Sequence, residues 1–112
     1  MCEVEERVAS AEVNSGVCGY QTRIRADFDE TSGEVALVIE TQCPNCQKLA
    51  EALPVVDGYQ VALTPPVRNI VYQAAAAAGL HASCPLPNAI LKLVEVACGL
   101  ALPRDVSIKL NR

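Results

Sequence analysis

The residues of this chain that can do chemistry are six cysteines and a single histidine. Four of the cysteines and the histidine lie in turns or near the starts of predicted helices: Cys18, Cys43, Cys46, His81 and Cys84. A thiolate is both a nucleophile and a soft metal ligand, and a helix N-terminus lowers the pKa of a thiol. Thiolates combined with one imidazole favour zinc or an iron–sulfur cluster. The set therefore indicates a metal centre or thiol redox chemistry.

The spacing of these residues is the basis for predicting metal ligands. Cys43 and Cys46 are separated by two residues where a predicted strand passes into a helix, and Cys84 follows His81 by three residues at another helix start. Together with Cys18 they supply four thiolates, which match the four ligands of a tetrahedral zinc site, and His81 can replace one of them. We expect these five residues to form a site for zinc or an iron–sulfur cluster. We do not expect turnover of a small substrate.

Two cysteines lie outside the expected site. Cys2 is near the N-terminus and has no assigned role. A free cysteine often behaves as a small buried hydrophobe. We assign Cys98 to the core because it continues the apolar stripe of the last predicted helix, formed by Ile90, Leu91, Val94 and Ala97.

The pattern that must position these cysteines begins with strands. Apolar and polar side chains alternate over residues 20–28, and residues 34–41 are rich in Val, Leu and Ile, so the two segments predict an antiparallel hairpin. Residues 8–13 predict a further short strand. The start of one strand and the end of its antiparallel partner are neighbours. We therefore expect Cys18 and Cys43 at the same end of the sheet.

The second half of the chain has helical periodicity. A helix is predicted over residues 44–53 with Pro44 in its first turn, another from the N-cap Thr64 to the C-terminal Gly79, and a third over residues 86–97. The second of these has the apolar stripe Val67, Ile70, Val71, Ala74 and Ala78. Residues 105–110 alternate again and predict an added C-terminal strand. The chain is thus expected to form a single α+β domain, residues 1–112, with about three antiparallel strands packed against three helices.

The composition narrows the function classes. The chain has 112 residues, of which 51% are hydrophobic and 20% charged, so it has enough apolar surface to fold and is not intrinsically disordered. A net charge of -4 argues against binding the phosphate backbone of nucleic acid. Neither a signal peptide nor a membrane span is predicted. We expect a cytoplasmic protein with reduced thiols and protein partners, and the sequence leaves a homo-oligomer open.

The order of these features resembles the NifU N-terminal (IscU-type) iron–sulfur scaffold family. Cys18-Gly19 resembles the Cys-Gly turn of that family, Cys43 its cysteine at a strand end, and His81 with Cys84 its later His-Cys pair. The resemblance implies an antiparallel sheet with helices on one side and a scaffold or carrier role for an iron–sulfur cluster. Tyr20 stands where that family has an aspartate, and Cys46 has no counterpart there.

Two other functions remain open. Cys43-Pro44-Asn45-Cys46, placed after a strand and opening a helix, resembles the active site of thioredoxin and glutaredoxin, which implies thiol redox chemistry in a fold with parallel strands. Alternatively, the domain is a non-catalytic interaction or assembly module. Its cysteines would then contribute packing and a structural zinc site.

Overall fold

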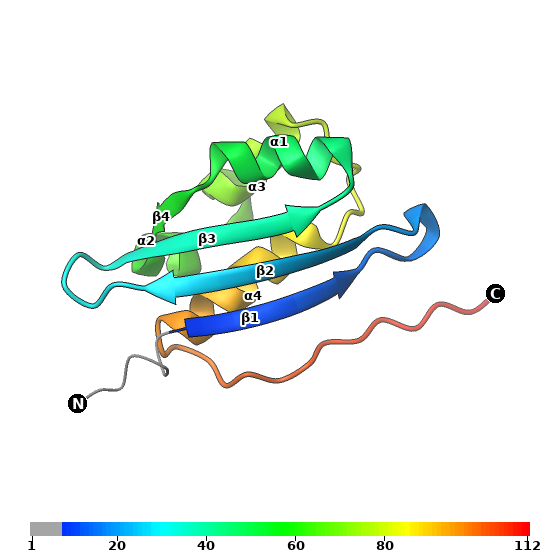
Figure 1. Ribbon diagram of the computed structural model, residues 1–112. Helices are drawn as coiled ribbons and strands as arrows, with labels where there is room; N and C mark the ends of the chain where they lie inside the picture. Colours follow the sequence, from blue (N-terminus) through cyan, green and yellow to red (C-terminus); the bar gives the residue numbers. More distant parts are fainter. Residues whose placement is uncertain (1–7) are drawn as a thin grey trace.

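The structure, a computed structural model, describes residues 8–112 and has a twisted antiparallel sheet with helices against one face (Figure 1). The sheet has four strands in the order β1-β2-β3-β4. This confirms the predicted α+β class, with one strand more than expected. The elements along the chain are β1 (Val8–Asn14), η2 (Gly16–Cys18), β2 (Gln21–Phe28), β3 (Glu34–Thr41), α1 (Pro44–Ala52), β4 (Val55–Asp57), α2 (Gly58–Leu63), η3 (Pro66–Arg68), α3 (Ile70–Ala77) and α4 (Leu86–Ala97).

The predicted hairpin is formed by β2 and β3, with Thr22 opposite Thr41 and Phe28 opposite Val35. Every second residue of β2 is buried, as the alternation of the sequence predicts. The other face of β2 is exposed to solvent. β1 pairs antiparallel with the free edge of β2 and confirms the predicted first strand.

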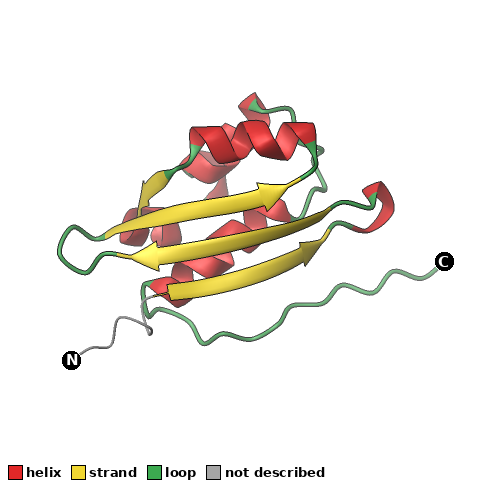
Figure 2. Cartoon of the chain, in the orientation of Figure 1, coloured by secondary structure: helices red, strands yellow, loops and turns green. Residues whose placement is uncertain are grey.

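The helices all lie against the buried face of the sheet (Figure 2). α4 packs against β1 and β2, and α1 packs against β3. The side chains that fill the space between these layers include Ile24, Leu49, Val71, Ile90 and Val94, each at most 2% exposed. α4 spans the twelve residues predicted for it. Among the described residues, no helix is long and apolar enough to cross a bilayer.

The fourth strand is β4, which the sequence pattern does not predict. It pairs antiparallel with the start of β3, with Val56 opposite Val35. The adjoining Pro54 carbonyl accepts a hydrogen bond from the Leu37 N–H at 2.9 Å. A strand of three residues is too short to show a period of two, so its pairing depends on the position that α1 gives it.

The middle helix differs from the prediction. In place of one helix starting at Thr64, the chain forms α2, the short turn η3 and then α3, whose N-cap is Asn69. The helix begins at Asn69 and not at Thr64 because the Asn69 side chain caps α3 and its amide also donates to carbonyls at the end of α2. Val67 and Ile70, expected in the apolar stripe, are 84% and 53% exposed.

The expected C-terminal strand is also wrong. Residues 101–112 form no helix or strand and are exposed throughout. They extend along the side of the molecule where β1 forms the sheet edge, without joining the sheet (Figure 1). Alternating side chains alone do not make a strand, because a strand also needs a ladder of backbone hydrogen bonds to a neighbour.

Candidate thiol site

The candidate site is built on the junction between β3 and α1. Cys43 is the N-cap of α1 and has extended backbone angles, while Pro44 occupies the first helical turn. The N–H of Cys43 donates to Oγ1 of Thr41 at 3.2 Å, and the buried Thr22 hydroxyl donates to the same oxygen at 3.0 Å. Gln47 donates from its side chain to the Thr41 carbonyl at 2.8 Å. These bonds fix the end of β3 against the first turn of α1, so the Cys43 backbone has a defined position.

The Cys43 thiol lies at the N-terminus of α1, where backbone N–H groups have no helical partner. Burial raises the pKa of Cys43, but hydrogen bonds from the Cys46 backbone, the Cys46 side chain and the Asn45 backbone outweigh it. The pKa of Cys43 is therefore below its ordinary value. Each of these bonds stabilises the thiolate, which is the nucleophilic form of cysteine.

The Cys46 thiol has the opposite character. Its residue is 4% exposed and faces the core from the first turn of α1. Burial raises the pKa of Cys46 to about 12, with further contributions from the hydrogen bond to the Cys43 side chain and from the neighbouring Cys84. Cys46 therefore stays protonated at neutral pH, and its S–H is available to stabilise the Cys43 thiolate.

Cys84 brings a third thiol from a distant part of the chain. It lies just before Pro85, the N-cap of α4, and its N–H donates to the His81 carbonyl at 3.0 Å. Its side chain is half-buried, and it is one of the groups that raise the pKa of Cys46. The side-chain amide of Asn45 donates to the Gly79 carbonyl at 3.2 Å and so ties α1 to the loop that carries Cys84. We call Cys43, Cys46 and Cys84 the thiol cluster.

The structure does not bring all five predicted ligands together. Cys18 ends the exposed η2 turn, which projects from the β1–β2 hairpin at the end of the sheet where α1 begins (Figure 1). It is not among the groups that act on the Cys43 and Cys46 thiols. His81 is exposed in the loop before α4. Cys98 is buried in the core, as predicted, whereas Cys2 lies outside the described residues.

Across residues 8–112, no group of three or more His, Cys, Asp or Glu side chains is arranged to hold a metal ion. Cys43 and Cys84 both raise the pKa of Cys46, but the three thiols do not form such a group. The five-residue metal site thus stays a prediction, of which three members are neighbours.

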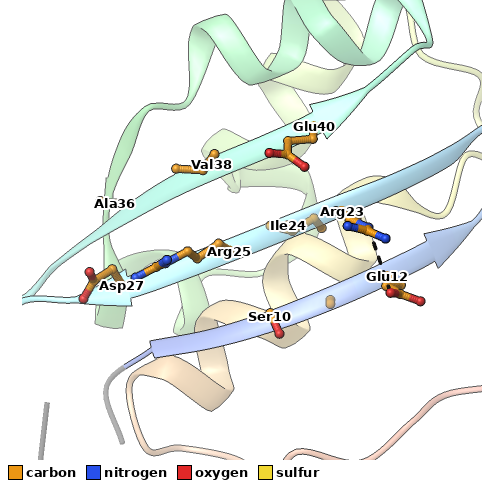
Figure 3. A pocket seen from close by; sticks show the side chains of 10 residues that line it. Ser10, Glu12, Arg23, Ile24, Arg25, Asp27, Ala36, Val38 and Glu40 are labelled. Carbon is orange, nitrogen blue, oxygen red and sulfur yellow. Dashed lines mark ion pairs between the residues drawn. The ribbon is translucent and has the colours of Figure 1, made fainter. Parts of the chain in front are cut away.

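The open face of the sheet carries charged side chains but no comparable cluster (Figure 3). Here Arg23 lies between Glu12 on β1 and Glu40 on β3 in the strand register. Its Nε is 4.0 Å from Oε2 of Glu12, and both side chains are more than 70% exposed, at 74% and 83%. An ion pair this exposed contributes about 0–1 kcal/mol. The face is a solvated surface, and none of its described side chains belongs to a group that could hold a metal ion.

Comparison with known proteins gives a family for almost the whole chain. A family of unknown function, DUF6951, matches residues 9–110. The chain belongs to the DUF6951 family. No curated protein and no solved structure matches it. The DUF6951 match includes every member of the thiol cluster, together with Cys18, His81 and residues 101–110 of the C-terminal segment.

Proposed function

We propose that this domain is a thiol redox protein in which Cys43 is the reactive thiol and Cys46 its disulfide partner. The observation that carries the proposal is the position of Cys43 as the N-cap of α1 with Cys46 in its first turn, where the Cys46 side chain and two backbone N–H groups lower the pKa of Cys43. One thiol is thereby activated as a nucleophile. The other is held protonated beside it.

The chemistry is a balanced exchange with a disulfide oxidant such as glutathione disulfide. The Cys43 thiolate attacks one sulfur of the oxidant and forms a mixed disulfide, releasing the other sulfur as a thiolate. The Cys46 thiol then transfers its proton to the second leaving thiolate and attacks Sγ of Cys43. The products are a Cys43–Cys46 disulfide and two reduced thiols. The reverse sequence reduces a substrate disulfide.

The fold that supports this chemistry is not that of thioredoxin, because all three strand pairs of the described sheet are antiparallel. The similarity between this domain and thioredoxin is local. Both have a cysteine pair, spaced by two residues, across the first turn of a helix that follows a strand. A half-buried Cys43 at that position remains open to a partner. We propose protein partners as its electron donors or acceptors, and the cytoplasm as a compartment that keeps the pair reduced.

The test is equilibration of the purified protein with glutathione buffers, followed by acid quenching and alkylation of the free thiols. We expect Cys43 and Cys46 to become protected together as the buffer becomes oxidising, and to be recovered on reduction. The buried Cys98 is an internal reference that stays reduced. If Cys43 and Cys46 are alkylated in full at every ratio of glutathione to its disulfide, the proposal is wrong.

A second candidate is binding of a soft metal, and the observation that favours it is a third thiol, Cys84, which is among the groups that raise the pKa of Cys46. Zinc takes four ligands in structural sites, so the thiol cluster needs one more, from Cys18 or His81. Both lie in exposed segments. The resemblance to iron–sulfur scaffold proteins involves Cys18, Cys43, His81 and Cys84, but not Cys46. A bound metal would supply the positive charge that three adjoining thiolates need.

The metal candidate is tested by purification without oxygen, visible absorption, and elemental analysis for iron and zinc. Iron with charge-transfer bands supports an iron–sulfur cluster, and zinc alone supports a structural site. The bound iron or zinc must be lost from the Cys84→Ser variant and retained in a Cys98→Ala variant. If metal is absent and the Cys43–Cys46 disulfide does not form, the remaining hypothesis is that the chain is an interaction or assembly domain.

A further inference from the structure

We propose that the C-terminal segment, residues 101–112, adds a strand to the β1 edge of a second copy of this chain, so that two copies exchange their segments and form a dimer. The inference does not depend on the thiol chemistry of the proposed function. Within the part of the chain that the structure describes, β1 is a sheet edge without a further strand, and the C-terminal segment has the side-chain pattern of a strand but belongs to no sheet.

The β1 edge is open to pairing. The strand order places β1 and β4 at the two edges of the sheet, and β1 has seven residues whereas β4 has three. A strand with a neighbour on one side directs the N–H and C=O groups of alternate residues outward, where another strand can pair with them. Natural edges are commonly blocked by proline, by lysine or by an inward-pointing charge. β1 has none of these, since its one charged residue, Glu12, has an 83% exposed side chain.

The inner face of β1 has room for larger neighbours. Ala9 and Ala11 lie opposite Ala26 and Ile24 of β2, on the face of the sheet that the helices cover (Figure 2). Ala26 and Ile24 are 0% and 2% exposed. Ala9 and Ala11 are only partly buried, although α4 packs against the same strand. The layer between β1 and α4 is therefore open at its outer side, and apolar side chains from an added strand would close it.

The C-terminal segment carries side chains that suit this edge. Val106, Ile108 and Leu110 alternate with Ser107 and Lys109, which is the period of a strand with one apolar face. The three apolar side chains are 56%, 78% and 88% exposed. Surface apolar residues that occur singly need no explanation, but a contiguous row of large ones marks an interaction surface.

Pairing with β1 suits both faces of the added strand. A strand that places its apolar side chains on the inner face, beside Ala9 and Ala11, places Lys109 on the outer face, where Glu12 lies. Whether the added strand is parallel or antiparallel to β1, one register sets Lys109 beside Glu12 while an apolar residue lies beside Ala11. Opposite charges on neighbouring strands stabilise a pairing. The charge pattern therefore agrees with the apolar pattern.

The segment is placed to leave its own copy. In a single copy it follows the β1 side of the molecule without joining the sheet, and every residue from 101 to 112 is exposed (Figure 1). Gly99, in the left-handed region at φ 78°, turns the chain out of α4, and Pro103 lacks the N–H that a strand ladder needs. Residues 99–104 thus act as a linker, and residues 105–110 extend over about 20 Å, close to the length of β1. Exchange of an identical element between two copies is a known route to dimers.

Zero-length cross-linking of Lys109 to Glu12 tests the exchange. A carbodiimide joins the Lys109 amine to the Glu12 carboxylate only where the two groups are in contact. Trypsin then releases peptide 8–23, in which Glu12 is the one acidic residue, linked to peptide 105–112. The sample is an equal mixture of ordinary copies and copies labelled with heavy nitrogen, unfolded together in urea and refolded with a reductant. The exchanged dimer predicts that about half of the linked peptides combine one labelled and one ordinary partner.

The mass of the reduced protein in solution is an independent measurement. Light scattering should give twice the chain mass of 11.9 kDa. Ile108→Lys places a charge on the apolar face of the segment, and the matched control Ser107→Lys places the same charge on the polar face. Both side chains are exposed in a single copy, so neither substitution disturbs the fold. Because each dimer has two junctions, Ile108→Lys should weaken the dimer about a hundredfold, whereas Ser107→Lys should leave it intact.

Three results would overturn the inference. Linked peptides that never combine the two labels would place the segment on the edge of its own copy. A monomer at millimolar concentration would exclude a second copy as the occupant of the β1 edge. A dimer that Ile108→Lys leaves intact would be formed by another surface. The Cys43–Cys46 disulfide is measured separately from all three, so the proposed function stands or fails on its own test.

Discussion

The sulfur of Cys98, at the end of α4, occupies the space that a side chain on Gly58 would need: a Cβ on Gly58 would lie 2.5 Å from it. Gly58 begins α2 directly after β4, and its N–H donates to the Gly33 carbonyl at 2.9 Å. Cys98 therefore acts in packing and is unavailable for chemistry. Burial, followed by the nearby Asp57 charge, raises its pKa, which agrees with this role.

We expect Gly58→Ala to destabilise the domain by about 1–3 kcal/mol, the range for overpacked cores. Removing the Cys98 sulfur relieves the worst contact, so the loss should be smaller in a Cys98→Ala background. The Val35 side chain, at 3.0 Å from the same Cβ position, keeps part of the cost. Urea unfolding of the four proteins in this mutant cycle measures the coupling. Equal losses in both backgrounds would contradict the contact.

Asn69 offers a second test of the helical layer. Its side chain, in a residue 1% exposed, accepts from the Val71 N–H at 3.0 Å and donates to the carbonyls of Val61 and Thr64 at 2.7 and 3.0 Å. Asn69→Ala loses the cap of α3 and leaves the two carbonyls without that donor. We expect a loss of about 2–4 kcal/mol in the free energy of unfolding. Asn69→Ser keeps a cap oxygen and should lose less. If the two variants are equally stable, the cap of α3 contributes nothing.

The reactivity of Cys43 should follow its lowered pKa. Alkylation by iodoacetamide requires the thiolate, so its rate should rise with a midpoint below the ordinary thiol value of about 8.5. Cys46→Ala removes the side-chain donor and should move the midpoint upward. Trypsin cleaves after Arg25 and Lys48, so the alkylation of Cys43 is measured by mass spectrometry of peptide 26–48. A midpoint at or above the ordinary value would show that the N–H groups of α1 do not stabilise the thiolate.

Because the pKa of Cys46 is raised, the free energy of unfolding should decrease as the pH rises. Its pKa in the folded protein is about 12, so it keeps its proton where the unfolded chain releases it. The resulting stability is fully present below the unfolded pKa and is lost as pH rises toward the folded one, by at most about 1.4 kcal/mol per pH unit.

Urea unfolding of reduced wild-type and Cys46→Ala proteins at about pH 8 and about pH 10 tests this dependence. The stability difference between them should shift in favour of the variant at the higher pH. Cys43 also titrates differently in the variant, so the comparison is repeated with Cys43→Ser in both proteins; groups away from Cys46 are common to both. If the difference between the two proteins does not change with pH, Cys46 is not held protonated.

The long periodic elements could be predicted from the sequence. β2 and α4 each repeat their pattern several times, so side-chain periodicity determines which face is buried. β4 could not, because three residues carry no period and its pairing depends on where α1 ends. The start of α3 was misplaced because Thr64 and Asn69 are both good N-caps, and the choice depends on carbonyls that only the folded chain brings near Asn69.

The candidate site could also be predicted from the sequence only in part. The contact between Cys43 and Cys46 follows from their spacing across one helical turn, which the sequence shows directly. Antiparallel pairing places Cys18 at the correct end of the sheet, but it does not determine the direction in which the η2 turn projects. The roles of Asn45 and Thr41 were missed. Both act through backbone groups of distant or neighbouring segments, which residue types alone do not indicate.

The most direct test of the central claim is the redox midpoint of the Cys43–Cys46 pair, measured by alkylation across a series of glutathione buffers. Thiol redox proteins have potentials of about -120 to -270 mV, whereas structural disulfides generally lie below about -300 mV. The proposed function predicts a reversible two-electron transition of this pair within the first range, in wild-type protein and in the Cys98→Ala control. A disulfide that does not form, or one that is not reduced in this range, would contradict it.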